Sequence, residues 1–273
     1  MPSLLSIPWP NLALAFALCL AISGLGFRRV DYFVSIGYAF SIAAQAVLLP
    51  LLYADRLDGW TIAADAMLLA YGLRLGLFLI ARERQPSFER ERQASLQRGL
   101  QIRGWLKITI WVTVAALYVA MYAPMQLLMA NATVEPGRTA VAIGVAIMVA
   151  GLGLEAMADA RKSAFKAKFP DRFCDAGLFR FVRSPNYFGE MVFWLGAWVT
   201  ALAHTLQPLD WLIGLAGLVS IQLIMLGSAR RLELKQAERY AGDSAYREYA
   251  GTVPVLVPFV PLYSLRKLRV YLG

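Results

Sequence analysis

The chain has very few of the side chains that build metal centres and disulfide frameworks. Its 273 residues include one histidine, His204, and two cysteines, Cys19 and Cys174. Two cysteines this far apart form no metal-ligand spacing, so we expect no metal site. The glycine-rich G-x-G-x-x-G pattern and the Walker pattern are also absent. A bound nucleotide would therefore not be held by a Rossmann domain or a P-loop.

Acidic residues are outnumbered, with 18 Asp and Glu against 27 Lys and Arg and a formal net charge of +9. In a soluble protein, such an excess suggests nucleic acid binding. This chain, however, is 59% apolar with a mean hydropathy of +0.54, whereas soluble domains average roughly 45–50% apolar. We therefore interpret the basic excess in terms of a membrane, and we expect no nucleic acid partner.

The apolar residues are concentrated in seven runs of helical length. Crossing a bilayer core of roughly 30 Å takes about 20 apolar residues in a helix. The sequence therefore predicts an all-α integral membrane protein, one membrane domain over 1–273 with seven transmembrane helices. The predicted segments are 9–26, 31–53, 60–81, 105–130, 136–158, 187–204 and 209–229.

Basic residues fall in alternate connections between these segments. Cytoplasmic connections of membrane proteins carry an excess of Lys and Arg, so we expect the N-terminus outside and the C-terminus in the cytoplasm. The opposite connections hold only Arg56 and Arg138. The basic connections hold 24 of the 27 Lys and Arg: Arg28 and Arg29, then seven within 82–107, seven within 161–183 and eight within 230–269.

Polar and ionisable side chains inside the predicted spans are few. Such groups are expensive in a bilayer and mark functional sites. Tyr71, Arg74 and Phe78 have the spacing of one helix face. The alternative for each residue is hydrogen bonding between helices, for instance of Arg74 with Glu155, and we favour this alternative for Asp65 and Gln222. The full set is Gln45, Asp65, Arg74, Glu155, Glu190 and Gln222.

The segment 184–190 predicts the start of a helix at the membrane surface. Ser184 suits an N-cap and Pro185 the first helical position. Asn186, Glu190 and Trp194 then line one face at steps of four. A helix N-terminus attracts anions, which favours a phosphate-bearing ligand. Basic residues beside anionic lipid are the alternative, but lipid does not account for Glu190. The preceding cations are Lys166, Arg172, Arg180 and Arg183.

Four motifs carry a resemblance to a known family: GLFR at 177–180, RSPNYFGE at 183–190, Tyr-x-x-Tyr at 246–249 and the Pro-rich stretch at 253–258. With these motifs, the chain resembles the bacterial branch of the steroid 5-alpha-reductase family, best over about 155–261. The outline Arg-x-Pro-x-Tyr followed by Glu is shared with isoprenylcysteine carboxyl methyltransferases and related phospholipid methyltransferases. Those enzymes bind S-adenosylmethionine in a similar fold.

The resemblance implies a seven-helix reductase of the bacterial inner membrane that binds NADPH on its cytoplasmic side. Residues 1–104 would supply the substrate side, and residues 105–273 the cofactor region. Asn186 and Glu190 match the residues that hold the nicotinamide in that family. The other cofactor-binding residues implied by the resemblance are Arg74, Arg84, Asp159, Lys166, Arg172, Trp194 and Glu233.

On the substrate side, the resemblance matches Tyr71 to the family's catalytic tyrosine, and we assign Gln45 a supporting role. A tyrosine hydroxyl can donate to a carbonyl oxygen on which negative charge develops. The expected reaction is hydride transfer to the C=C bond of an apolar α,β-unsaturated ketone, such as a 3-keto-4-ene steroid, that enters a monomeric enzyme from the bilayer. Two positions differ from the animal enzymes: Ala46 replaces a carboxylate after Gln45, and Glu233 replaces a histidine.

Two other functions stay open at this stage. One is an S-adenosylmethionine-dependent membrane methyltransferase, which also needs an apolar channel and a cofactor site at a helix end. The other is a transporter or a non-catalytic lipid-binding protein. Inverted repeats and broken helices would indicate transport, and the sequence has neither. Asn186 and the Gly189–Glu190 pair favour the reductase.

Overall fold

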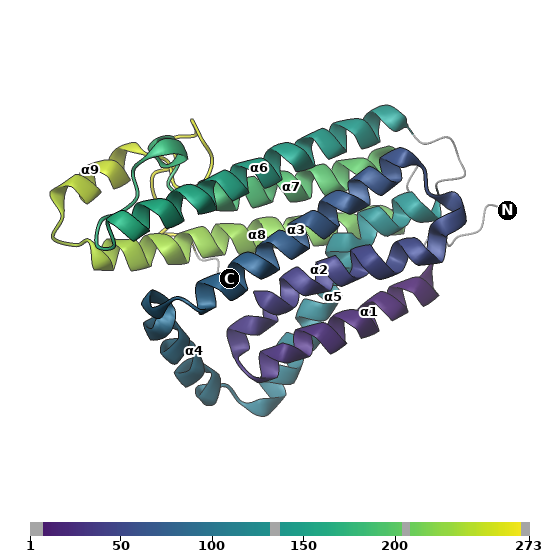
Figure 1. The fold of residues 1–273 in the computed structure, drawn as a ribbon, viewed down its shortest axis with the longest axis horizontal. Helices are drawn as coiled ribbons and strands as arrows, with labels where there is room; N and C mark the ends of the chain where they lie inside the picture. Colours follow the sequence, from purple (N-terminus) through teal and green to yellow (C-terminus); the bar gives the residue numbers. More distant parts are fainter. Residues whose placement is uncertain (1–7, 132–136, 204–207, 269–273) are drawn as a thin grey trace. The chain divides into compact units, whose positions relative to one another are not determined.

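The computed structural model describes residues 8–131, 137–203 and 208–268, and these are almost entirely helical (Figure 1). His204 lies outside the described residues. Short 3-10 helices extend or connect the α-helices: η1 (Gly24–Phe27), η2 (Val30–Phe33), η3 (Leu49–Arg56), η4 (Pro86–Phe88), η5 (Gly177–Arg180) and η6 (Ala201–Ala203). The α-helices are α1 (Trp9–Ser23), α2 (Ile36–Leu48), α3 (Gly59–Glu83), α4 (Glu89–Gln101), α5 (Gly104–Ala130), α6 (Arg138–Lys168), α7 (Pro185–Thr200), α8 (Pro208–Arg239) and α9 (Ser244–Thr252).

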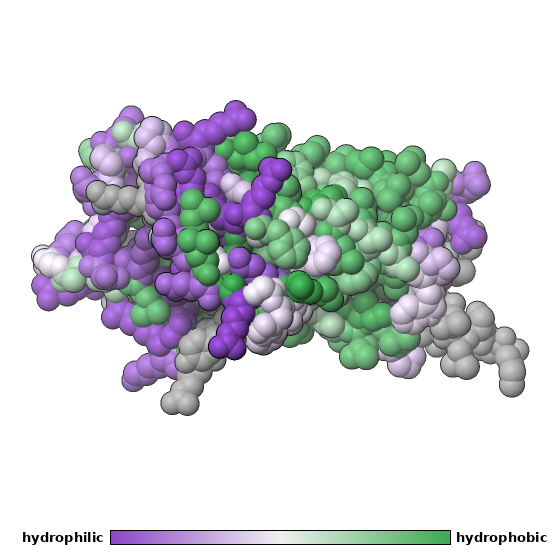
Figure 2. Space-filling view, turned by 90° about the horizontal axis from the view of Figure 1, so that it is seen from below, coloured by the Kyte–Doolittle hydropathy of each residue, from purple (hydrophilic) through white to green (hydrophobic). Residues whose placement is uncertain are grey.

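Six helical segments in the described part of the chain are long and apolar enough to cross a membrane. Apolar side chains cover a broad stretch of the face of the molecule that Figure 2 shows. This supports the predicted all-helical integral membrane protein, since water-soluble helices turn their apolar residues inward. The six spans are Trp9–Phe27, Val30–Arg56, Gly59–Glu83, Gly104–Ala130, Arg138–Lys168 and Pro208–Arg239.

The seventh predicted segment, 187–204, is shorter than expected. It forms α7, an α-helix of 16 residues, and then changes to the 3-10 turn η6 at Ala201. The Thr200 hydroxyl donates to the Ala197 carbonyl at 2.7 Å, within this last turn. By length and composition the structure thus gives six candidate spans among the described residues, where the sequence predicted seven.

The chain divides into two compact units that interleave along the sequence. Unit 1 comprises Met1–Val145 and Ala197–Gly217, and unit 2 comprises Ala146–Gly196 and Leu218–Gly273. The helices α6, α7 and α8 contribute residues to both units.

In unit 1, α2 packs closely on α3, and α1 packs on α2 and α5 (Figure 1). Gly72 makes the first contact possible, because a Cβ there would lie 2.6 Å from the Ala39 carbonyl oxygen. Asp58 caps α3 by accepting a hydrogen bond from the Thr61 backbone N–H at 2.8 Å. Partial burial raises the pKa of Asp58, but the hydrogen bonds from Thr61 outweigh it, so the pKa lies below its usual range. The cap therefore stays charged at neutral pH.

In unit 2, α6 and α7 cross with their backbones in contact. A Cβ on Gly189 would lie 2.7 Å from the Glu155 backbone nitrogen and 2.8 Å from the Gly151 carbonyl oxygen. A Cβ on Gly151 would lie 2.4 Å from the Phe193 backbone nitrogen. Small residues let membrane helices approach this closely. The crossing therefore requires glycine at both positions.

We predict that Gly189→Ala forces α6 and α7 apart and lowers the free energy of unfolding by about 1–3 kcal/mol, as overpacking does in tightly packed cores. Gly153→Ala is the matched control, because nothing lies within 4 Å of a Cβ at that position of α6. It should keep or slightly raise stability, since alanine is the better helix former. Thermal unfolding in detergent measures both. Equal melting temperatures for the two variants would contradict the close crossing.

Candidate functional site

The helix α7 begins at Pro185, as the sequence predicted. The Phe188 backbone N–H donates to the Ser184 carbonyl at 3.1 Å, which forms the first helical turn. Asn186, Glu190 and Trp194 follow at steps of four, so they share one face of the helix. This face is the first component of the candidate site.

The α7 face is largely closed to solvent. Glu190 is 6% exposed and Trp194 is 2% exposed. Asn186 is half-buried, and its Oδ1 atom is shielded from solvent with no hydrogen-bond partner among the described residues. A buried acceptor without a donor costs about 1–3 kcal/mol. A ligand carrying an N–H or O–H group could satisfy it.

Two acidic residues of α6 belong to the same region of unit 2. Glu155 is 3% exposed and Asp159 is 8% exposed. The Glu155 backbone lies directly against Gly189, one residue before Glu190. The glycine crossing thus brings this part of α6 to the start of α7, where the predicted site residues lie.

Arg183 ties the start of α7 to the C-terminal segment. Its backbone N–H donates to the Pro254 carbonyl at 2.8 Å, and its Nε donates to the Val253 carbonyl at 3.1 Å. Its Nη2 donates to the Tyr263 carbonyl and lies 3.6 Å from Glu233 Oε1. The Arg183 and Glu233 side chains are each only 3% exposed. The sequence marked Arg183 only as one cation among several, because its partners lie 50 or more residues away.

Glu233, which the resemblance assigned to the cofactor, is engaged in the same cluster. Its Oε2 accepts a hydrogen bond from the Leu265 backbone N–H at 2.8 Å. Its Oε1 lies 3.4 Å from Arg266 Nε as well as near Arg183. This carboxylate therefore holds the C-terminal segment to α8.

The two predicted phosphate ligands of the α6–α7 connection have different surroundings. Lys166 donates to the Pro170 carbonyl at 3.2 Å, to the Arg172 carbonyl and to the Tyr240 hydroxyl at 2.9 Å. Its three donors are thus used to hold the connection. Arg172 is 59% exposed and pairs with Asp175 at 3.3 Å. Of these two cations, Arg172 is the one available to an incoming anion.

The Tyr-x-x-Tyr motif supports this connection through aromatic packing. Phe173 stacks on Tyr249 at 5.1 Å between ring centroids and packs edge-on against Tyr240 and Tyr246. The Tyr249 hydroxyl donates to the Phe179 carbonyl at 2.7 Å. Burial raises the pKa of Tyr249, so this hydroxyl stays protonated and can donate.

The predicted substrate-side residues lie in unit 1. Tyr71 is fully buried, and its hydroxyl lies 2.8 Å from the Tyr38 hydroxyl. Gln45 is also fully buried, and its Nε2 donates to the Ser41 and Tyr118 carbonyls at 3.3 Å each. Its Oε1 atom has no hydrogen-bond partner among the described residues.

Tyr38 is a residue that the sequence analysis missed. Tyr38, Ser41 and Gln45 have the i, i+3, i+7 spacing of one helix face, the same spacing that grouped Tyr71 with Arg74. The spacing could therefore have placed Tyr38 on the same face of α2 as Gln45.

The remaining predicted residues fall into two groups. Arg74 is half-buried in α3, and Arg84 is exposed directly after α3, both in unit 1. Asp65 accepts a hydrogen bond from the Tyr122 hydroxyl of α5, and Gln222 donates to the Met191 carbonyl of α7 at 3.0 Å. The interhelical roles favoured for Asp65 and Gln222 are therefore confirmed.

The family comparison covers most of the chain. Residues 28–253 match the model of DUF1295, a family described as proteins of unknown function. The chain therefore belongs to the DUF1295 family, which is associated with steroid 5-alpha-reductase-like proteins. No curated protein and no solved structure matches the chain.

Proposed function

We propose that the protein is an NADPH-dependent membrane reductase that adds hydride to the C=C bond of an apolar α,β-unsaturated ketone, such as a 3-keto-4-ene steroid. The observation that carries the proposal is the α7 face, where the shielded Oδ1 of Asn186 has no donor among the described residues and lies on the side of buried Glu190 and Trp194. Membership of a family associated with steroid 5-alpha-reductase-like proteins supports it.

The residues of unit 2 fit NADPH. A nicotinamide carboxamide carries the N–H donors that Asn186 Oδ1 lacks. Glu190 can accept from the same amide, and the buried Trp194 provides an apolar wall. Arg172 presents an exposed guanidinium for a phosphate. NADPH, when bound, supplies the hydride, while the protein supplies binding and orientation.

We assign the carbonyl donor to Tyr71. A hydrogen bond of 2.8 Å joins the Tyr38 and Tyr71 hydroxyls, and either of them can be the donor. When Tyr38 donates, the proton of Tyr71 can point at a substrate oxygen. A donor aimed at an oxygen that gains negative charge stabilises the transition state more than the ground state. Gln45 supports this region from α2.

We also propose that α7 crosses the bilayer as a seventh span. Its 16 residues reach about 24 Å at roughly 1.5 Å per residue, and the three residues of η6 add about 6 Å at roughly 2.0 Å each. Together they match the hydrocarbon thickness of about 30 Å. With seven spans, the partition of basic residues puts the N-terminus outside and the C-terminus, with the cofactor residues, in the cytoplasm of a bacterial inner membrane.

We predict opposite accessibility for Asp55 and Ser244, which are both exposed. Single cysteines would be placed at these positions in a Cys19→Ser, Cys174→Ser background and labelled with a membrane-impermeant maleimide in intact cells. Asp55→Cys should react from outside, and Ser244→Cys only after lysis. If α7 did not cross, α8 would carry Ser244 to the side of Asp55. Labelling of both positions from outside would thus contradict the proposal that α7 is a seventh span.

We predict that Asn186→Ala and Glu190→Ala each weaken NADPH binding at least about tenfold, which corresponds to 1.4 kcal/mol. Glu248→Ala is the matched control, because it removes an exposed carboxylate of α9 in the same unit. Binding is measured by thermal shift and fluorescence titration of the purified protein. Stabilisation by S-adenosylmethionine in place of NADPH would indicate the methyltransferase, and unchanged binding in both variants would place the site elsewhere.

We predict that Tyr71→Phe lowers kcat by about 10²–10³, the usual effect of losing one oxyanion donor, with NADPH affinity near that of the wild type. Tyr38→Phe should lower kcat less, because it removes only the partner of Tyr71. Tyr53→Phe is the control, because it deletes the hydroxyl of another buried tyrosine of unit 1, which accepts a hydrogen bond from Asn11 at 2.7 Å. Turnover is measured on enones, beginning with 3-keto-4-ene steroids. A Tyr71→Phe rate within a few-fold of the wild type would exclude Tyr71 as the donor.

A further inference from the structure

A cavity of about 350 Å³ lies in unit 1 at the ends of the membrane spans. It is bounded by the connection between α1 and α2, by α4 and by the start of α5. Ligand pockets begin at about 300 Å³, so the cavity can hold a phosphate ester. Among the side chains that the structure describes, its polar lining contains Arg28, Arg29, Lys107, Gln93 and Gln97 but no Asp or Glu.

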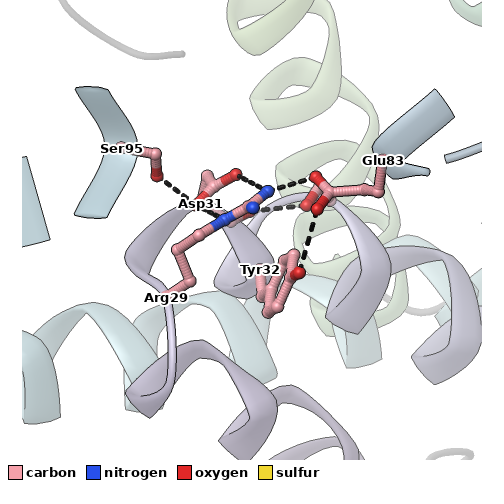
Figure 3. A network of polar contacts seen from close by, with 6 residues as sticks. Arg29, Asp31, Tyr32, Glu83 and Ser95 are labelled. Atoms are coloured by element: carbon pink, nitrogen blue, oxygen red, sulfur yellow. Dashed lines mark hydrogen bonds and ion pairs between the residues drawn. The ribbon is translucent and has the colours of Figure 1, made fainter. Parts of the chain in front are cut away.

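Two of the lining residues, Arg29 and Ser95, belong to a network of polar contacts centred on Arg29 (Figure 3). Arg29 pairs with Asp31 at 2.7 Å and with Glu83, the last residue of α3. The Ser95 hydroxyl of α4 donates to Asp31, and the Tyr32 hydroxyl donates to Glu83 at 3.0 Å. The network fixes α4 to the bundle and compensates the charge of Arg29 with two carboxylates.

Arg28 and Lys107, the other two cations of the lining, have no such compensation. Within the described part of the chain, neither side chain makes an ion pair or a hydrogen bond, and the nearby Asp31 and Glu83 are both engaged by Arg29. Two positive charges without counter-charges in one cavity attract an anion. Phosphate groups suit this arrangement, because a guanidinium and an ammonium can donate to its oxygens together.

The depth of the site indicates where the phosphate comes from. Arg28 directly follows the span Trp9–Phe27, and Lys107 is in the first turn of the span Gly104–Ala130. Both charges therefore lie at the headgroup level of a bilayer. Trp105 is 63% exposed and Leu100 is 78% exposed beside them. Tryptophan at this depth is typical of the membrane interface, and these apolar side chains offer a surface to acyl chains.

We propose that this cavity, which we name the Arg28–Lys107 site, binds the phosphate of an anionic phospholipid such as phosphatidylglycerol. The phosphate lies between Arg28 and Lys107, and the acyl chains run along Phe27 and Leu100 toward the hydrocarbon. The lipid thereby stabilises α4 against the end of the bundle, since α4 and the α1–α2 connection both line the cavity. The proposal is independent of the reductase activity and of the cofactor residues.

The test uses the full-length protein, purified in a neutral detergent and delipidated. The protein is then titrated with phosphatidylglycerol or phosphatidylcholine, and lipid binding is measured by native mass spectrometry and thermal shift. The wild type should bind phosphatidylglycerol at least about tenfold more tightly than phosphatidylcholine, which corresponds to a difference of 1.4 kcal/mol in binding free energy. Arg28→Gln with Lys107→Gln should abolish this preference, and the charge-conserving pair Arg28→Lys with Lys107→Arg should keep it.

The matched control removes two charges outside the cavity, with Arg98→Gln and Arg103→Gln, both exposed residues that do not line it. This variant should retain the preference. An equal loss in the control would show diffuse surface attraction and overturn the site. If millimolar inorganic phosphate displaced phosphatidylglycerol, and the acyl chains added nothing to the affinity, the site would bind free phosphate. That result would overturn the proposal of a lipid ligand. An absent preference in monodisperse wild-type protein would overturn both.

Discussion

The backbone contact between α6 and α7 at Gly151 and Gly189 determines where the polar groups of unit 2 lie. Because neither glycine leaves room for a Cβ, the two helices meet with Glu155 against the residue before Glu190. Buried carboxylates are costly in a membrane protein, and Glu155, Asp159 and Glu190 are all less than a tenth exposed. A simple packing core would not need them, which favours a binding role for this region.

Arg183 and Glu233, which are not part of α7, hold the start of this helix in place. A buried ion pair pays a desolvation cost that can cancel its attraction, so its value here is better sought in the arrangement it specifies. Arg183 donates to carbonyls of the C-terminal segment, and Glu233 accepts from the Leu265 backbone. These contacts fix the entry to the helix.

Hydropathy predicted seven spans, which include the six that the described residues form, and helix-start signals predicted the start of α7 at Pro185. Both signals depend on residues close together in the sequence. The change from α-helix to 3-10 helix at Ala201 could not be predicted, because apolar content is the same on either side. The surroundings of Lys166 and Glu233 were also hidden, since Tyr240 and Leu265 are distant in sequence. The contact between the Tyr38 and Tyr71 hydroxyls could not be predicted either, because the two residues lie on different helices, 33 positions apart.

The basic residues of the predicted cytoplasmic connections are not equivalent, although the positive-inside rule counts them equally. Arg29, Arg183 and Lys166 are engaged by carboxylates or carbonyls, so an anion would have to displace internal bonds to reach them. Arg172 has only an exposed pair with Asp175, and such pairs contribute about 0–1 kcal/mol. A phosphate can therefore replace Asp175 at little cost. Arg28 and Lys107 have no described counter-charge to replace. The compensation of each cation, and not the number of cations, thus separates topology signals from candidate phosphate sites.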